Sequence, residues 1–316
     1  MKLTLKSALM ALSLVAATGA TAADWTPPGP IKMMIAFRAG GGADTQARLI
    51  AEELETRHGW KIIPEQVTGK GGINAALALK DAPKDGTAIA IVVTETLGYN
   101  AAAAKEAGIS PKDFTGLTTT AGFQMGIVSK TEAGYGTFAD VIEAAKGGTE
   151  IRFGVMSPRL ADLAYILGRE NGVEFNIISV RGGKAVLDGV NAGDMDVGFM
   201  AGIQGKGVAA GDLVNLASAL SVPLNQTPDA PTLDAFGVKY NSDGYFVFIG
   251  PAGMDAAAAE AISKAIAEVA AASDSKAAGM IMKAFGGATT ISGAELEMLL
   301  DAGYDAAGEL MSDAEN

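Results

Sequence analysis

The sequence predicts an α/β fold in which helices cover both faces of parallel sheets. Short apolar runs alternate with segments of helical periodicity, an order typical of parallel strands joined by crossover helices. The chain contains 41 glycines but only 6% aromatic residues, which favours α/β layers joined by tight turns over an aromatic-rich sandwich. Its 316 residues suffice for two domains of ordinary size.

Residues 1–23 have the pattern of a cleaved secretory signal peptide, with an N-terminal core helix as the alternative. Lys2 and Lys6 precede an apolar stretch at residues 8–17, and residues 20–22 form an A-x-A cleavage pattern. We therefore expect export to the periplasm. The chain has no cysteine, so we expect neither disulfides nor a lipid anchor.

The first part of the chain predicts three strands that alternate with helices. Strands are expected at residues 31–37, 61–64 and 88–93, where short runs are mostly apolar. A helix should begin at Asp44, because positions 47, 50, 51 and 54 are apolar at helical spacing, and should end at Gly59. A second, Ala- and Leu-rich helix should end at Lys80.

A second set of alternating units starts near residue 125. Helices are expected at residues 138–146, around 160–167 and at 184–192. Strands are expected at 151–155, 175–180, 196–200 and 213–220. A polar, proline-bearing stretch at residues 223–231 interrupts this pattern. A strand at 245–250 and a mostly helical C-terminal part follow.

Two glycine-rich turns form the predicted ligand site. The first contains Gly40, Gly41 and Gly42, and the second contains Gly69, Gly71 and Gly72. Each follows a strand and precedes a helix, where unpaired backbone amides and the helix dipole favour an anion. Neither turn has the spacing of a P-loop or a dinucleotide fingerprint. Tight turns without a ligand are the alternative.

Charged side chains near these turns are further candidates. Arg38 offers a bidentate fork for a carboxylate and Lys70 a point charge, unless both are solvated surface cations. Asp44 is expected to cap the helix or to accept a hydrogen bond from the ligand. Asp196 is expected to point at the cleft from the start of its strand. A calcium site formed with Asp194 lacks any EF-hand spacing.

Composition and motifs argue against other classes of function. The net charge of −12 disfavours nucleic-acid binding. The chain has one histidine, His58, at the expected end of a helix, and it has no cysteine nucleophile, H-E-x-x-H or G-x-S-x-G motif. We therefore expect no enzyme activity, no cofactor and no metal. A periplasmic hydrolase or lyase that acts through carboxylates is the alternative.

Seven segments match, in order, motifs that occur together in one protein family. Residues 35–44 read IAFRAGGGAD and are followed by Ala47 and Arg48, close to the family pattern P-F-x-A-G-G-x-x-D-x-x-A-R. The others are EQVTGKGG at 65–72, PKDGT at 83–87, VRGG at 180–183, GDMD at 193–196, PDAPT at 228–232 and GPAG at 250–253. Together they resemble the receptors of tripartite tricarboxylate transporters, the TctC or Bug family, over essentially the whole chain after residue 23.

The resemblance implies a two-domain periplasmic-binding-protein fold, similar to type II, with a ligand cleft between the domains and two hinge crossings. Domain I would comprise residues 24–123 and 245–316, and domain II residues 124–244. The ligand carboxylate would contact backbone amides of both glycine turns, including those of Phe37 and Ala39. Domain II would close over it with Ser157, Arg159 and Arg181.

Departures from the family pattern bear on the ligand. Arg38 replaces a residue that is commonly small in the family, and Arg159 lies where glycine amides are frequent. Two extra arginines would suit a second carboxylate, so we expect a di- or tricarboxylate. The resemblance further implies delivery of this ligand to the membrane subunits of a tripartite tricarboxylate transporter. Presentation to a sensor kinase is the alternative. The sequence offers no oligomerisation seam, so we expect a monomer.

Overall fold

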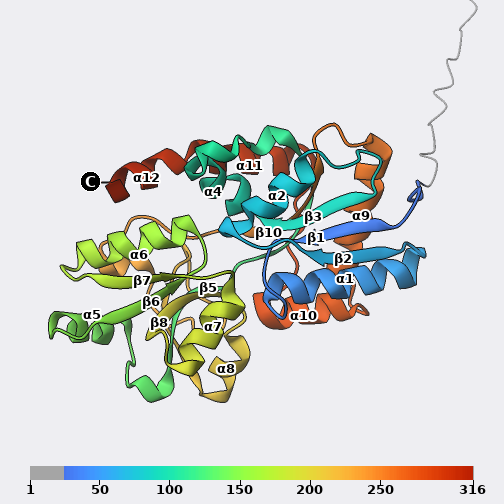
Figure 1. The fold of residues 1–316 in the computed structure, drawn as a ribbon. Coiled ribbons are helices and arrows are strands. Elements are labelled where there is room, and N and C mark those ends of the chain that lie inside the picture. Colours follow the sequence, from blue (N-terminus) through green and yellow to red (C-terminus); the bar gives the residue numbers. More distant parts are fainter. Residues whose placement is uncertain (1–24, 316) are drawn as a thin grey trace, which may run out of the picture.

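The computed structural model describes residues 25–315, so the predicted signal peptide at residues 1–23 lies outside the described residues. The chain forms two lobes, each built on a five-stranded sheet that is covered by helices (Figure 1). In the part of the chain described, no helix is long and apolar enough to cross a membrane.

The first lobe contains a sheet with the strand order β2-β1-β3-β10-β4. Its strands are β1 (Ile31–Ile35), β2 (Ile62–Gln66), β3 (Ala88–Val93), β4 (Phe114–Gly122) and β10 (Tyr245–Pro251). One face packs against α1 (Gly42–His58), α9 (Ala256–Ala271) and α10 (Lys276–Phe285). The other packs against α2 (Ile73–Lys80), α3 (Thr94–Leu97), α4 (Tyr99–Ala103) and α11 (Gly293–Asp305).

The second lobe contains a sheet with the strand order β7-β6-β8-β5-β9. Its strands are β5 (Met125–Lys130), β6 (Ile151–Val155), β7 (Phe175–Ser179), β8 (Val197–Ala201) and β9 (Leu213–Ser218). Its helices are α5 (Phe138–Lys146), α6 (Pro158–Glu170), α7 (Gly183–Ala192) and α8 (Gly205–Ala210). Short 3-10 turns are η1 (Lys70–Gly72), η2 (Lys105–Ala107), η3 (Pro111–Asp113), η4 (Thr131–Ala133) and η5 (Leu233–Phe236).

The α/β class predicted from the sequence is confirmed, but neither sheet is wholly parallel. In the first sheet β10 runs antiparallel to β3 and β4, and in the second β5 runs antiparallel to β8 and β9. Both reversed strands directly follow a crossing between the lobes, so they enter their sheets from the end that faces the other lobe. The reversal therefore follows from the hinge connections.

Strand β4 has no counterpart among the predicted elements. Its sequence, FTGLTTTAG, lacks an apolar run, yet Thr118, Thr119 and Thr120 are fully buried. Their hydroxyl groups are satisfied inside the protein, for example by the hydrogen bond from Thr120 Oγ1 to Gln46 Oε1 at 2.6 Å. Burial of threonine is tolerated only with such partners, which the sequence alone does not display.

The two crossings between the lobes lie side by side. One is the Phe123–Gln124 connection from β4 to β5, and the other leads through Gly244 into β10. The backbone amide of Phe123 donates to the Gly244 carbonyl oxygen at 2.9 Å. The C-terminal helix α12 (Ala307–Glu315) packs against both α4 and α6, so it touches both lobes. That residues 24–123 with 245–316 and residues 124–244 are separate domains stays a prediction.

Candidate functional site

A cavity between the two lobes, called the main cavity below, lies at the carboxyl ends of several strands, and a wider hollow of about 660 Å³ adjoins it along Gly40, Gly41 and Gly42. The main cavity has a volume of about 60 Å³, which has room for a few water molecules. The first lobe contributes Phe37, Arg38, Gly41, Gly42, Ala43, Gly71, Val93, Glu95, Asn100, Phe123 and Phe246. The second contributes Met125, Met156, Ser157, Leu160, Gly183, Lys184, Ala201 and Ile203.

The first glycine turn, residues 38–42, is held by a buried carboxylate. Asp44 accepts hydrogen bonds from the Gly40 amide at 2.9 Å, from Arg48 Nε at 2.8 Å and from Gln66 Nε2 at 3.3 Å. The expectation that Asp44 caps α1 is wrong, because the helix begins two residues earlier with Gly41 as its N-cap. Asp44 fixes the turn through its hydrogen bond with the Gly40 amide, and it does not line the main cavity.

The second glycine turn, residues 68–72, has an unusual backbone. Four successive residues have positive φ angles: 126° at Gly69, 48° at Lys70, 62° at Gly71 and 99° at Gly72. The Gly71 carbonyl accepts hydrogen bonds from Thr96 Oγ1 and Asn100 Nδ2. A Cβ atom on Gly71 would lie 2.4 Å from Asn100 Nδ2. Only glycine fits both this conformation and this close approach.

The structure brings the two turns together at the cavity, but only in part. Gly41 and Gly42 of the first turn and Gly71 of the second line it together with Phe37 and Arg38. Four other predicted residues do not line the main cavity: Ala39, Gly40, Gly69 and Gly72. Of these, Ala39 and Gly40 are exposed to solvent. Lys70 is also outside the main cavity, exposed and 3.9 Å from Glu106.

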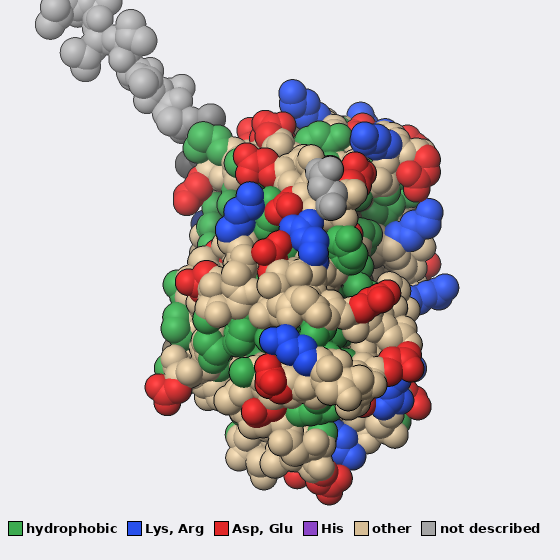
Figure 2. Space-filling model, turned by 90° about the vertical axis from the view of Figure 1, so that its left-hand side faces the viewer, with side chains coloured by type: hydrophobic (Ala, Val, Ile, Leu, Met, Phe, Trp, Pro, Cys, Tyr) green, Lys and Arg blue, Asp and Glu red, His purple; other side chains and the backbone are tan. Residues whose placement is uncertain are grey.

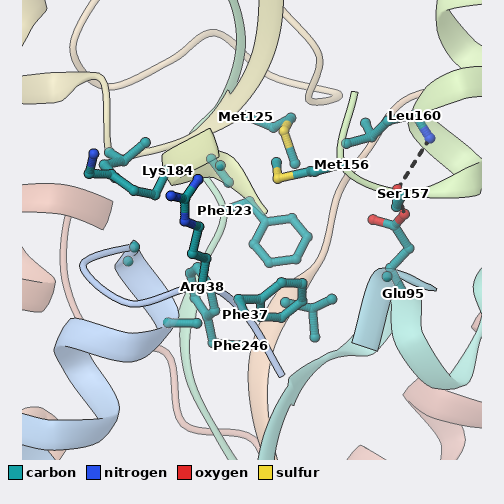
Figure 3. A pocket seen from close by; sticks show the side chains of 18 of the residues that line it. Phe37, Arg38, Glu95, Phe123, Met125, Met156, Ser157, Leu160, Lys184 and Phe246 are labelled. Carbon is teal, nitrogen blue, oxygen red and sulfur yellow. Dashed lines mark hydrogen bonds between the residues drawn. The ribbon is translucent and has the colours of Figure 1, made fainter. Parts of the chain in front are cut away.

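The cavity wall is apolar in the middle and charged at its two ends. Figure 3 shows Arg38 and Lys184 on one side, Glu95 on the other and aromatic and Met side chains between them. Asp188, on α7, pairs with both cations and lies 3.9 Å from Arg38 Nη1. The cationic end is therefore partly neutralised by the protein itself.

Glu95 is a buried acid that the sequence analysis did not single out. It follows β3 on α3, and its Oε1 accepts a hydrogen bond from Ser157 Oγ of the other lobe at 2.5 Å. Burial raises the pKa of Glu95, and the Arg159 charge and hydrogen bonds from Ser157 and Asn100 offset this only in part. A sequence signal existed, because Glu95 directly follows a predicted strand at the edge where the glycine turns were expected.

Three of the residues predicted in the second lobe have different surroundings. Ser157 lines the cavity and caps α6, accepting a hydrogen bond from the Leu160 amide at 3.3 Å. Arg159 does not line the main cavity, because its guanidinium donates to the Asn241 carbonyl at 2.6 Å. Arg181 is exposed outside the cavity.

The expectation that Asp196 points at the cleft is wrong. It precedes the amino end of β8, whereas Ala201 at the carboxyl end lines the cavity. Asp196 instead forms a bidentate ion pair with Arg152, at 2.7 and 3.0 Å. Partial burial would raise the pKa of Asp196, but hydrogen bonds from Arg152 outweigh this and lower it. Its role is structural.

Other features of the surface offer little chemistry. His58 stacks on Trp60, with ring centroids 4.9 Å apart, outside the main cavity. Among residues 25–315, no three His, Asp or Glu side chains are grouped to hold a metal ion. Acidic and basic side chains are interspersed over the face shown in Figure 2.

Comparison with known sequences identifies related proteins. A family model described as "Tripartite tricarboxylate transporter family receptor" matches residues 46–285. A Cupriavidus necator protein, the UPF0065 protein in the gbd 5′ region, is 25% identical over 79% of this chain and 77% of its own length. A UPF0065 protein of Agrobacterium vitis is 24% identical over 78% of this chain and 73% of its own.

Solved structures share the fold at low sequence identity. The R. palustris protein Rpa4515, solved with adipate, matches with a TM-score of 0.80 and 20% identity over 92% of this chain and 98% of its own. MatC from Rhodopseudomonas palustris, solved with malate, has a TM-score of 0.76 and 19% identity over 92% and 99%. The periplasmic binding protein BugD has a TM-score of 0.78 and 20% identity over 92% and 99%.

Proposed function

This chain belongs to the tripartite tricarboxylate transporter receptor family and is a periplasmic solute-binding receptor, and on that basis we propose that it captures a small carboxylate between its lobes and delivers it to the membrane subunits of such a transporter. It acts by binding, without turnover, as a monomer. Delivery to a sensor kinase is the alternative that the sequence leaves open. Uptake of the carboxylate by vesicles that contain the transporter subunits distinguishes the two. Delivery to the transporter predicts uptake only when this protein is added.

The convergence of two glycine turns at one apolar cavity supports this proposal most strongly. The amides of Gly42 and Ala43 lie in the first turn of α1, where no intrahelical acceptor exists for them. Amides at a helix N-terminus, near the positive end of the helix dipole, favour a carboxylate. The malate and adipate present in the two R. palustris structures are both small carboxylates.

The expectation of a di- or tricarboxylate loses one of its two supports in the structure. Arg159 is bonded to Asn241 and does not line the main cavity. A second carboxylate would therefore lie near Arg38 and Lys184, which together form the cationic end.

A thermal-shift screen of mono-, di- and tricarboxylates tests the proposed function. A true ligand at a hundred times its Kd should stabilise the protein by about 2.7 kcal/mol. Replacing Arg38 by Ala should weaken binding roughly threefold, since a half-exposed charge contributes about 0.7 kcal/mol. Arg181→Ala, which removes the same charge outside the cavity, should leave the affinity unchanged. Absence of a shift with every carboxylate would refute the proposal.

A further inference from the structure

One end of the cavity presents hydrogen-bond acceptors whose capacity the protein does not fill. Glu95 is only 5% exposed and Asn100 is fully buried, and both line the cavity. Asn100 Nδ2 donates to the Gly71 carbonyl at 3.1 Å, while its Oδ1 has no partner among the described residues. Glu95 receives hydrogen bonds from Ser157 and Asn100, and because a carboxylate offers about four lone-pair sites it can still accept from a further donor.

The protein does not supply Glu95 with a bonded cation. Within residues 25–315, no Lys or Arg lies close enough to Glu95 to form an ion pair. Arg159 contributes only a longer-range attraction, because its guanidinium is bonded to Asn241. A buried carboxylate without a bonded cation is costly, and removing an unsatisfied acceptor such as Asn100 Oδ1 from water is costly as well.

The chemistry of this end decides which ligand group it accepts. A second carboxylate placed beside Glu95 would meet a like charge or a group that must stay protonated. An ammonium group would instead donate to the Glu95 carboxylate and to Asn100 Oδ1, and charge-assisted bonds of this kind are strong. Both unmet requirements of the protein are therefore met by one ligand group.

We propose that Glu95 makes the receptor selective for amino carboxylates, with the ligand amine at Glu95 and the ligand carboxylate toward the glycine turns and Arg38. The apolar body of the ligand would lie between Met125 and Met156, which Figure 3 places between the two charged ends. This inference rests on the proposed function, because it presumes a carboxylate in the same cavity.

Ligands matched in length test the inference by calorimetry at neutral pH. One series is 6-aminohexanoate, adipate and hexanoate, and a shorter one is 4-aminobutyrate, succinate and butyrate. In at least one series, the wild type should bind the amino acid at least tenfold more tightly than the diacid and the plain acid. Glu95→Gln should reduce affinity for the amino acid at least tenfold and raise affinity for the diacid.

Glu106→Gln is the matched control, because it makes the same substitution at an exposed position outside the cavity. It should retain the preference for the amino acid. If Glu95→Gln fails to fold, Glu95→Asp, which keeps the charge, should retain a weaker preference. A wild-type preference for the diacids, or an unchanged ratio in Glu95→Gln, would overturn the inference and leave the receptor assignment intact. Failure of every carboxylate to bind would overturn both.

Discussion

At the scale of single residues, burial determines the chemistry of this cleft more than charge does. The charged groups at the rim, Arg38 and Lys184, already share Asp188 and are accessible to water. Glu95 lies in an apolar wall, and its nearest polar contacts are neutral groups of Ser157 and Asn100. A single buried carboxyl group therefore has the larger influence on ligand choice.

Burial of Glu95 predicts a characteristic dependence of stability on pH. Its pKa is raised above the ordinary 4.5, so the folded protein holds this proton more tightly than the unfolded chain. The contribution to stability is full below pH 4.5 and is lost as the pH rises through the raised pKa. The groups that face Glu95 are Ser157 at the N-cap of α6, Arg159 on α6, and Tyr99 and Asn100 on α4.

The measurement is the free energy of urea unfolding, without ligand, from pH 4 to pH 8. The wild type should lose stability relative to Glu95→Gln as the pH rises through this window. The half-buried Asp162 also has a raised pKa, and its effect is common to both proteins. Parallel pH profiles for the two proteins would contradict the prediction.

At the scale of elements, the second glycine turn depends on backbone geometry that side chains prevent. Gly71 combines a φ of 62° with the close approach of Asn100, while its neighbour Lys70 is the one described non-glycine residue with positive φ. The turn also lies close to the other lobe, because a Cβ on Gly71 would be 3.3 Å from Ser157 Cβ. A change here affects both the turn and its contact with the other lobe.

Gly71→Ala should therefore destabilise the protein by about 2–4 kcal/mol, through a strained φ and a steric clash with Asn100. It should also weaken carboxylate binding. Gly134→Ala is the matched control, since Gly134 has a φ of 81° but a Cβ added there would have no atom within 4 Å. Strain alone should cost it about 1 kcal/mol. Equal losses in urea unfolding would show that the close approach to Asn100 is unimportant.

At the scale of the whole molecule, polar contacts connect the two lobes around the cleft. Tyr99 Oη donates to Asp162 between α4 and α6, and Arg169 on α6 pairs with Asp313 on α12 at 2.9 Å. The adjacent crossings at Phe123 and Gly244 provide the hinge about which such contacts form or break. The lobes can therefore close over a ligand by a hinge motion.

Removing the Tyr99 hydroxyl should shift the ligand-free receptor toward an open arrangement. Tyr99→Phe keeps the ring but leaves the half-buried Asp162 without this donor. We expect a larger radius of gyration by small-angle X-ray scattering without ligand, and an affinity about threefold lower, since opening reduces the binding-competent population. Tyr165→Phe, at an exposed position, should change neither quantity. An unchanged radius in Tyr99→Phe would contradict this role.

Local pattern sufficed for much of this molecule, including the α/β class, most strands and the bounds of α5. Apolar runs and glycine punctuation are local signals, so the bounds of β3 and β6 agree with those expected. Strand β4 could not be predicted, because its buried threonines do not form an apolar run. The sequence misplaces Asp196 because the amino and carboxyl ends of a strand lie at opposite ends of the sheet, and only the carboxyl end of β8 reaches the cavity.

By itself, the sequence determined the class of fold, the two glycine turns and the family of receptor, because each depends on short segments and their order. Only the tertiary structure decided which side chains meet in the cleft. In the tertiary structure Arg159 donates to the Asn241 carbonyl. Glu95 accepts a hydrogen bond from Ser157, although the two residues are 62 positions apart in the sequence. Such pairings depend on how two lobes pack, and no local pattern encodes the position of one lobe against the other.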